Sequence, residues 1–135
     1  MTNQEQMSEQ EQQEWIRNQY QVATKYLADK GLVTESVVDT ESRYLVPLFS
    51  VWKLKLMDKS YVWVVCGDLP TDHITAGAAP NAREAVHNFS LKWQLQAENL
   101  LRTGVKEQEE FAKILIGRAD GLYDLYNNEQ LWHPA

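Results

Sequence analysis

The stretch VWKLKLMDKSYVWVVC, residues 51–66, carries the pattern that decides the fold. Apolar residues alternate with others from Trp52 to Leu56, which is typical of a strand with one buried face. Residues 61–66 are rich in β-branched and aromatic side chains, which favour strands. The polar residues 58–60 between these halves fit a tight turn. The stretch therefore predicts an antiparallel β-hairpin.

The sequence before the turn sets the length of the first strand. We expect that strand to run from Tyr44 to Met57, with Pro47 near its start because proline cannot donate to a central ladder. Residues 32–43 are mixed in character and predict a connector with at most a short helical turn. An isolated hairpin is marginally stable in water, so helices must cover it or another chain must extend it.

Helical patterns lie on both sides of the hairpin. The first predicted helix begins at residue 8 or 12 and ends at residue 30, where Gly31 follows as a C′ glycine. The second begins after Asn81, an N-cap residue with Glu84 at capping-box spacing, and ends before Gly104.

The last predicted helix begins near Lys106. Gly117 and Gly121 interrupt its apolar row, and since glycine is unfavourable in a helix, they predict a close helix contact on that face. Near the end of the chain, Trp132 is expected to dock against the fold.

The order of these elements predicts an α+β domain: an N-terminal helix, an antiparallel hairpin, and two long C-terminal helices packed on the small sheet. The length of 135 residues fits one domain. We expect residues 1–13 to form an acidic, Gln- and Glu-rich tail and residues 14–135 to form a single domain.

Composition narrows the class of partners. The net charge of −6 and pI near 5.0 argue against a nucleic-acid partner. No apolar run approaches the roughly 20 residues of a membrane-spanning helix, so no membrane partner is expected. A single cysteine excludes an intrachain disulfide, and no signal peptide is visible, so we expect a cytoplasmic protein.

Three segments of the chain carry a resemblance: GDLPTDH at 67–73, NAREA at 81–85 and FSLKWQ at 89–94. Together with neighbouring residues over about 14–132, they are similar to an uncharacterised bacterial family labelled only as a domain of unknown function. The resemblance implies a single-domain cytoplasmic bacterial protein. It implies no activity, cofactor or catalytic residue.

The segment GDLPTDHI, residues 67–74, is the first candidate site, and we predict a loop there. Asp68, Asp72 and His73 are residue types that bind a ligand or a divalent cation or perform acid–base chemistry. The spacing matches no standard metal signature, so no metal is expected. The alternative is structural, because Gly, Asp and Pro after a strand are also turn chemistry.

The start of the helix after Asn81 is the second candidate. Helix N-termini attract anions, and Arg83 and His87 lie one turn apart on one side. The alternative is that Arg83 pairs with Asp68 or Asp72 and locks the acidic loop to the helix.

Cys66 ends a predicted strand, and we interpret it as a small buried residue. The alternative is a nucleophile with His73 or His87 as its base.

The aromatic content favours an interaction surface. One small sheet and three helices are not expected to bury every tryptophan, and a leftover aromatic face suits a homodimer. We therefore predict a non-enzymatic protein-interaction module without a cofactor, whose partner is a protein or a second copy. The alternative is a small-anion or metal-dependent binding protein or enzyme that uses residues 67–74 and the helix start at 81. The tryptophans are Trp15, Trp52, Trp63, Trp93 and Trp132.

Overall fold

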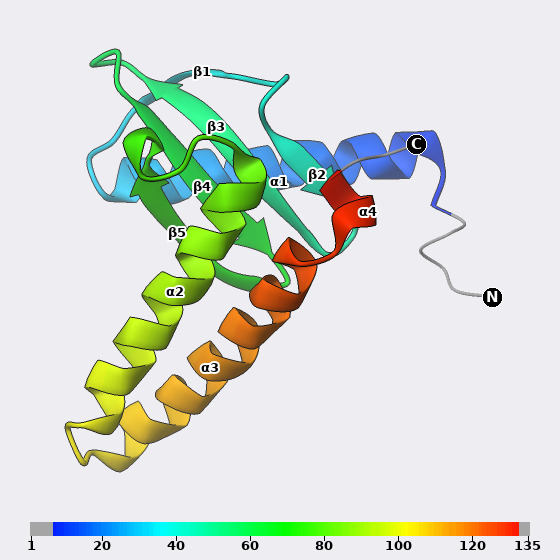
Figure 1. Ribbon diagram of the computed structural model, residues 1–135. Coiled ribbons are helices and arrows are strands. Elements are labelled where there is room, and N and C mark those ends of the chain that lie inside the picture. Colours follow the sequence, from blue (N-terminus) through cyan, green and yellow to red (C-terminus); the bar gives the residue numbers. More distant parts are fainter. Residues whose placement is uncertain (1–6, 133–135) are drawn as a thin grey trace. The chain divides into compact units, whose positions relative to one another are not determined.

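The structure, a computed structural model, describes residues 7–132 and has an α+β fold (Figure 1). The predicted class and the order of a helix, an antiparallel sheet and two long helices are confirmed. The elements are α1 (Glu9–Asp29), β1 (Thr34–Val37), β2 (Arg43–Leu45), β3 (Phe49–Leu56), β4 (Tyr61–Gly67), β5 (Leu69–Thr75), the 3-10 turn η2 (Ala76–Ala78), α2 (Ala82–Leu101), α3 (Lys106–Tyr126) and α4 (Glu129–Trp132).

The chain forms two compact units. The first extends to Ala82 and contains α1 and the sheet, and the second begins at Arg83 and contains the helices that follow. The single domain expected for residues 14–135 stays a prediction.

The sheet is antiparallel and has the strand order β1-β3-β4-β5. The short strand β2 pairs with the same edge of β3 as β1 does, but at the beginning of β3, whereas β1 pairs with its end. The predicted hairpin is its centre, because Trp52 pairs with Val64 and Lys55 pairs with Tyr61. Lys59 closes the turn at a φ of 76°, and the predicted hairpin is confirmed.

Two strand predictions need correction. Residues 34–37 were expected in a connector and form β1 instead. The strand expected from Tyr44 to Met57 is split, because β2 ends at Leu45 and β3 begins at Phe49. Pro47 lies in the turn between them and has no N–H to donate, which explains why the ladder stops there.

The prediction of a loop at residues 67–74 is also wrong, because Leu69–Thr75 forms strand β5. Among the described strands β5 pairs only with β4, so it lies at an edge of the sheet. Pro70 is compatible with an edge strand, where one side of the backbone makes no ladder bonds. The turn chemistry of Gly67 and Asp68 produces the bend that reverses the chain into β5.

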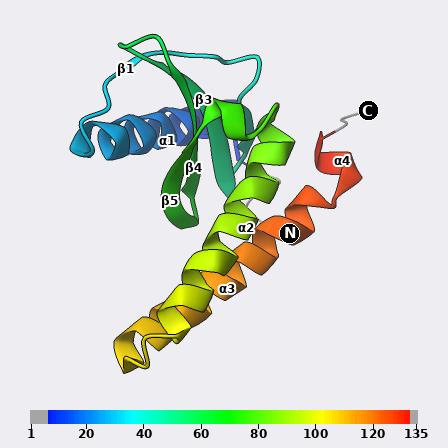
Figure 2. The same cartoon turned by 60° about the vertical axis from the view of Figure 1, so that its left-hand side comes forward.

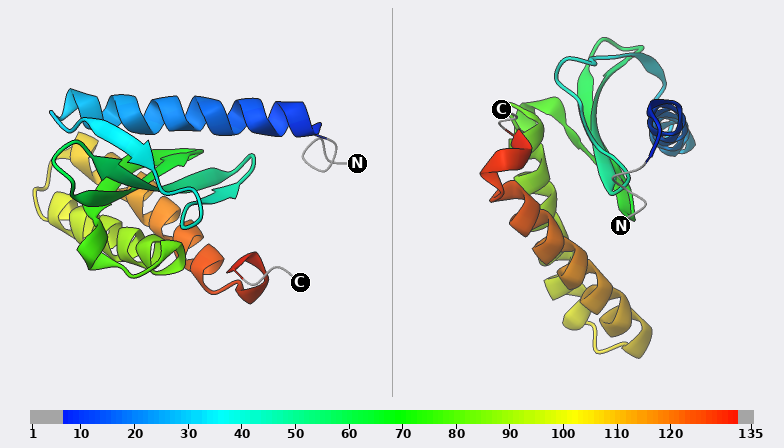
Figure 3. Two further views of the ribbon diagram at one scale, coloured as in Figure 1. Left: turned by 90° about the horizontal axis from the view of Figure 1, so that it is seen from above. Right: turned by 90° about the vertical axis from the view of Figure 1, so that its right-hand side faces the viewer.

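Helix α1 runs across one face of the sheet (Figure 3). Ser8 and Glu11 form a capping box at its start, and Gly31, at a φ of 80°, follows its end. The N–H of Leu32 donates to the carbonyl of Leu27 over 2.9 Å, which completes a Schellman cap. Both predicted helix ends are therefore confirmed, and residues 9–13 of the expected tail belong to α1.

The first unit has its main core between α1 and the sheet. Side chains on one face of β3 and β4 pack against Ala23 and Leu27 of α1. Val51, Trp63 and Val65, whose side chains alternate with that set, are fully buried as well. The central strands are thus buried more completely than the predicted half-buried pattern. The core residues of β3 and β4 that face α1 are Trp52, Leu54, Leu56, Val62, Val64 and Cys66.

Helices α2 and α3 lie side by side as an antiparallel pair (Figures 1 and 2). The hydroxyl of Ser90 donates to the carbonyl of Ala119 over 2.8 Å, which marks their contact. The helix contact predicted at Gly117 and Gly121 is wrong: a Cβ at either position meets no atom within 4 Å among the described residues.

The short helix α4 follows at the end of the described chain. Trp132 is buried, and its indole N–H donates to the carbonyl of Leu125 over 3.0 Å, so the predicted docking of this tryptophan is confirmed. None of the helices in residues 7–132 has the length and apolar character needed to cross a bilayer.

Candidate functional site

Tyr26 of α1 joins two of the candidate residues. Its hydroxyl lies 2.9 Å from Nδ1 of His73 and 3.4 Å from Oδ1 of Asp72, both on β5. Burial and the nearby Asp72 carboxylate raise the pKa of Tyr26 to about 12. The phenol therefore keeps its proton near neutral pH and acts as a hydrogen-bonding bridge between α1 and the edge strand.

The same carboxylate also serves the backbone of the edge strand. Oδ1 of Asp72 accepts a hydrogen bond of 2.8 Å from the N–H of His73. On the other side, the ammonium of Lys30 lies 4.9 Å from the centre of the Tyr26 ring, a cation–π distance. Asp72 and His73 thus belong to one ordered cluster, whereas Asp68 is exposed at the bend before β5.

Arg83 holds the end of α3 within the second unit. Its Nε donates to the carbonyl of Tyr126 over 2.9 Å, and its terminal nitrogen lies 3.0 Å from Oε1 of Glu129. The guanidinium also lies 5.3 Å from the centre of the Tyr126 ring. Arg83 therefore joins the start of α2 to the end of α3 and to α4. Its predicted pairing with Asp68 or Asp72 would connect the two units and stays a prediction.

His87 lies in the same cluster. Its ring stacks on Tyr126 at 4.3 Å and 17°, and its Nδ1 is 3.8 Å from a carboxylate oxygen of Glu84. The Tyr126 hydroxyl donates to the other oxygen of Glu84 over 3.2 Å. Burial, followed by the charge of Glu84, raises the pKa of Tyr126. The predicted proximity of Arg83 and His87 is confirmed, and their common neighbour is an aromatic ring.

Cys66 is buried in the core beneath α1. Its thiol lies 3.4 Å from the hydroxyl of Ser50 and 3.5 Å from the carbonyl of Gln19. Burial raises the pKa of this thiol, which keeps it in the unreactive protonated form. The interpretation of Cys66 as a small buried residue is confirmed.

The expectation that tryptophans would be left on the surface needs correction. Trp52, Trp63, Trp93 and Trp132 are each no more than 7% exposed, and Trp15 is half-buried. Other apolar side chains, aliphatic and aromatic, are exposed on the helices of the second unit. Leu91 and Leu95 on α2 are 47% and 63% exposed, and Ile116 and Tyr123 on α3 are 37% and 45% exposed.

These four residues lie on one side of the helix pair. His87, Leu91 and Leu95 follow one another at intervals of four, so they form a stripe along α2. Ile116 and Tyr123 are seven apart and form a stripe along α3. The rings of His87 and Tyr123 lie 6.1 Å apart, which shows that the two stripes are neighbours. We name Leu91, Leu95, Ile116 and Tyr123 the hairpin face.

Tyr26 and Tyr126 were not identified as site residues from the sequence. Each stood in a helical apolar row, a pattern that predicts burial and gives no sign of a polar role. The ligand-binding role of Asp68, Asp72, His73, Arg83 and His87 stays a prediction. Within residues 7–132 no group of three or more His, Cys, Asp or Glu side chains is arranged to hold a metal ion.

Comparison with known proteins places the chain in a family. No curated protein and no solved structure matches it. One family model matches residues 9–132, which is nearly the whole chain. The matched range includes the clusters around Tyr26 and Tyr126 and the hairpin face. The chain therefore belongs to the family described as a domain of unknown function (DUF4826).

Proposed function

We propose that this protein is a cytoplasmic, non-enzymatic interaction module that binds a second copy of itself through the hairpin face. The observation that carries the proposal is the alignment of four exposed apolar side chains on two adjacent helices. Clustered apolar side chains on a surface are typical of association sites, whereas scattered ones are not. The single buried cysteine is compatible with a reducing compartment.

The size of the helix pair supports association with a second copy. A helix of about 20 residues is roughly 30 Å long, and two helices side by side are roughly 20 Å wide. Such a face buries about 600 Å² on each copy, or roughly 1,200 Å² in total, which reaches the range of specific interfaces. A two-fold axis places the same patch on both copies, so Leu91 and Leu95 face apolar residues of the partner.

Changing a central leucine to a charged residue tests the proposal. Burying one leucine contributes about 1.5–3 kcal/mol, and symmetry counts each leucine twice. Leu95→Glu is therefore expected to weaken the dimer by about 3–6 kcal/mol, or roughly a hundredfold to ten-thousandfold. Val22→Glu on α1 is the matched control, because Val22 is an exposed apolar helix residue, at 43%, outside the hairpin face.

Sedimentation equilibrium measures the outcome, with circular dichroism to confirm that each variant is folded. The wild type and Val22→Glu are expected to be dimers at tens of micromolar, and Leu95→Glu is expected to be a monomer. A wild type that stays monomeric at millimolar concentration, or a Leu95→Glu variant as dimeric as the wild type, would contradict the proposal.

A further inference from the structure

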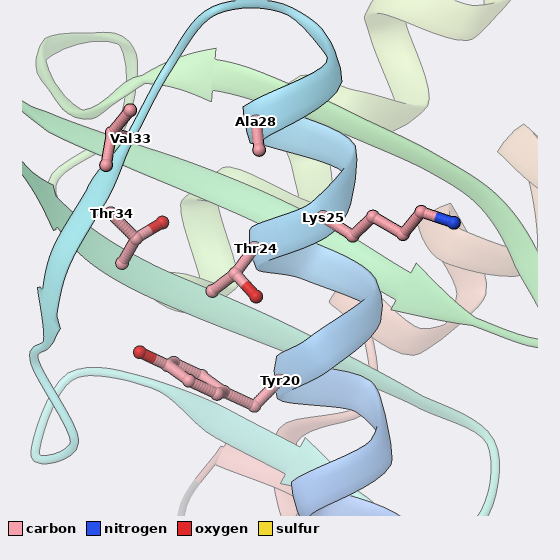
Figure 4. Close-up of a pocket in the computed structure, with 6 residues that line it drawn as sticks. All are labelled: Tyr20, Thr24, Lys25, Ala28, Val33 and Thr34. Atoms are coloured by element: carbon pink, nitrogen blue, oxygen red, sulfur yellow. The ribbon is translucent and has the colours of Figure 1, made fainter.

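The first unit has a shallow depression between α1 and the beginning of β1, with a volume of about 370 Å³ (Figure 4). Its lysine, Lys25, extends across α1 and away from β1. Oγ1 of Thr34 has no hydrogen-bond partner among the described residues, but it is buried and cannot be reached from the depression. The depression therefore lacks the convergent polar groups of a binding site, and the hairpin face of the second unit carries the stronger indication of binding.

Gln94 lies on α2 beside the leucines of the hairpin face. It is exposed and follows Leu91 by three positions, a spacing that makes two side chains neighbours on a helix surface. Leu95 is the next residue along the chain. Nε2 of Gln94 donates to the hydroxyl oxygen of Ser90, one turn earlier, over 3.3 Å. Because Ser90 is buried against α3, this hydrogen bond holds the amide on the side of α2 that is nearest to α3.

The contact of Ser90 with α3 gives the position of the amide within the hairpin face. The hydroxyl of Ser90 donates to the carbonyl of Ala119. Ala119 follows Ile116 by three positions and precedes Tyr123 by four, so it lies between these two exposed residues on one side of α3. Gln94, which is bonded to the same Ser90, therefore occupies the middle of the hairpin face.

The hydrogen bonds of Ser90 also fix the orientation of the Gln94 amide. The proton of the Ser90 hydroxyl is donated to Ala119, so its oxygen can only accept, and the amide must turn its NH2 group towards it. One N–H and the carbonyl oxygen Oε1 of Gln94 remain, and neither is hydrogen-bonded to another protein group within residues 7–132. The end of the side chain therefore offers a donor and an acceptor side by side.

Association through the hairpin face changes what this amide requires. A polar group at the centre of an apolar interface loses its water, which is costly unless the group is hydrogen-bonded. In a two-fold dimer, a residue on the axis meets the same residue of the second copy. An amide with a donor and an acceptor to spare is complementary to its own copy, because each carbonyl oxygen accepts from the N–H of the other.

We infer that the Gln94 side chains of two copies hydrogen-bond to each other across a two-fold axis at the centre of the hairpin face, and that this pair determines how the copies are aligned. A single polar residue in an apolar helical interface is a well-attested means of fixing register. The inference rests on the proposed self-association, because it assigns the residue that specifies that interface.

Opposite charges at position 94 test this contact. Homodimers of Gln94→Glu or of Gln94→Lys bring two like charges together, so each variant alone is expected to dimerise about a hundredfold more weakly than wild type. An equimolar mixture pairs glutamate with lysine, and its heterodimer is expected to be at least about tenfold tighter than either homodimer. Because Gln94 is exposed in the single chain, both variants are expected to fold.

Gln96 provides the matched control. It is exposed on the same helix, but two residues correspond to about 200° of rotation around the helix axis, which places it outside the hairpin face. Gln96→Glu, Gln96→Lys and their mixture are expected to dimerise like the wild type. Sedimentation equilibrium gives the dissociation constants, and circular dichroism shows whether each variant is folded.

Failure of the inference can be told from failure of the proposed function. A wild type that is monomeric at millimolar concentration contradicts both. A dimeric wild type whose Gln94→Glu and Gln94→Lys variants dimerise equally well overturns the inference alone. The inference is also overturned if both variants are weakened and their mixture recovers no affinity, because residue 94 then meets a different part of the second copy.

Discussion

Gly67, at the bend between β4 and β5, is the position where adding one methyl group should cause the greatest damage. Its φ is +136°, and a Cβ there would lie 2.5 Å from Cα of Phe49 and 2.6 Å from the carbonyl oxygen of Leu48. This φ lies outside the left-handed helical region, in backbone space that is nearly restricted to glycine, and costs an alanine about 1–3 kcal/mol. Overlap with backbone atoms costs about 1–3 kcal/mol more, because the two nearest atoms belong to the backbone and not to a flexible side chain. Gly67→Ala is therefore expected to lower the free energy of unfolding by about 2–6 kcal/mol.

Gly31→Ala is the matched control for this substitution. Gly31 also has a positive φ, of +80°, but its Cβ would meet nothing within 4 Å among the described residues. Only the conformational cost of about 1–2 kcal/mol is expected there. Urea unfolding monitored by tryptophan fluorescence gives both values from the midpoint and slope. Equal destabilisation of the two variants, within about 0.5 kcal/mol, would refute the assignment of a backbone clash at Gly67.

Three further substitutions or titrations test other parts of the structure. Gly117→Ala in α3 is expected to stabilise the protein by about 0.8–1 kcal/mol in the same urea assay, because its Cβ meets open space; a destabilised variant would restore the predicted helix contact. The raised pKa of Tyr26, about 12 against 10.0, means that its contribution to stability is complete below pH 10 and is lost as pH rises through about 12. The urea midpoint of wild type is expected to fall between about pH 10 and pH 12 as Tyr26 ionises, and Tyr26→Phe is expected to lack this fall. A fall in the variant equal to that in wild type would contradict the prediction. Cys66 is expected to react with iodoacetamide far more slowly in the native than in the urea-unfolded protein, as measured by mass spectrometry; equal rates would show that the thiol is accessible.

The elements that could be predicted are those whose signals are local. The C′ glycine of α1 at Gly31 and the alternation through Trp52 and Leu56 each depend on a few adjacent residues. The strand β5 was missed because its sequence, with Pro70 and Asp72, is unfavourable for a central strand and is tolerated only at an edge. Whether a strand lies at an edge depends on the pairing of the whole sheet, which the sequence of the strand does not contain.

The candidate site could also be predicted only in part, because the contacts between its residues join distant positions of the chain. Asp72 and His73 were identified by residue type, but their partner Tyr26 is 47 positions away from His73 and carries no motif. The contact of Arg83 with Glu129 likewise spans 46 positions. Helical periodicity correctly placed Trp93 on the buried side of α2, yet it gave no reason to expect that glycines in α3 would face open space.

The hydrogen bond from the N–H of His73 to the carboxylate of its neighbour Asp72 has a consequence for concentrated solutions. A strand from another molecule that approached β5 would find this backbone donor already engaged. Such a strand would gain one hydrogen bond fewer, worth about 1 kcal/mol, or about a fivefold lower tendency to add at each encounter. Because fibre growth would repeat that step with every added molecule, the Asp72 side chain would disfavour polymerisation along this edge.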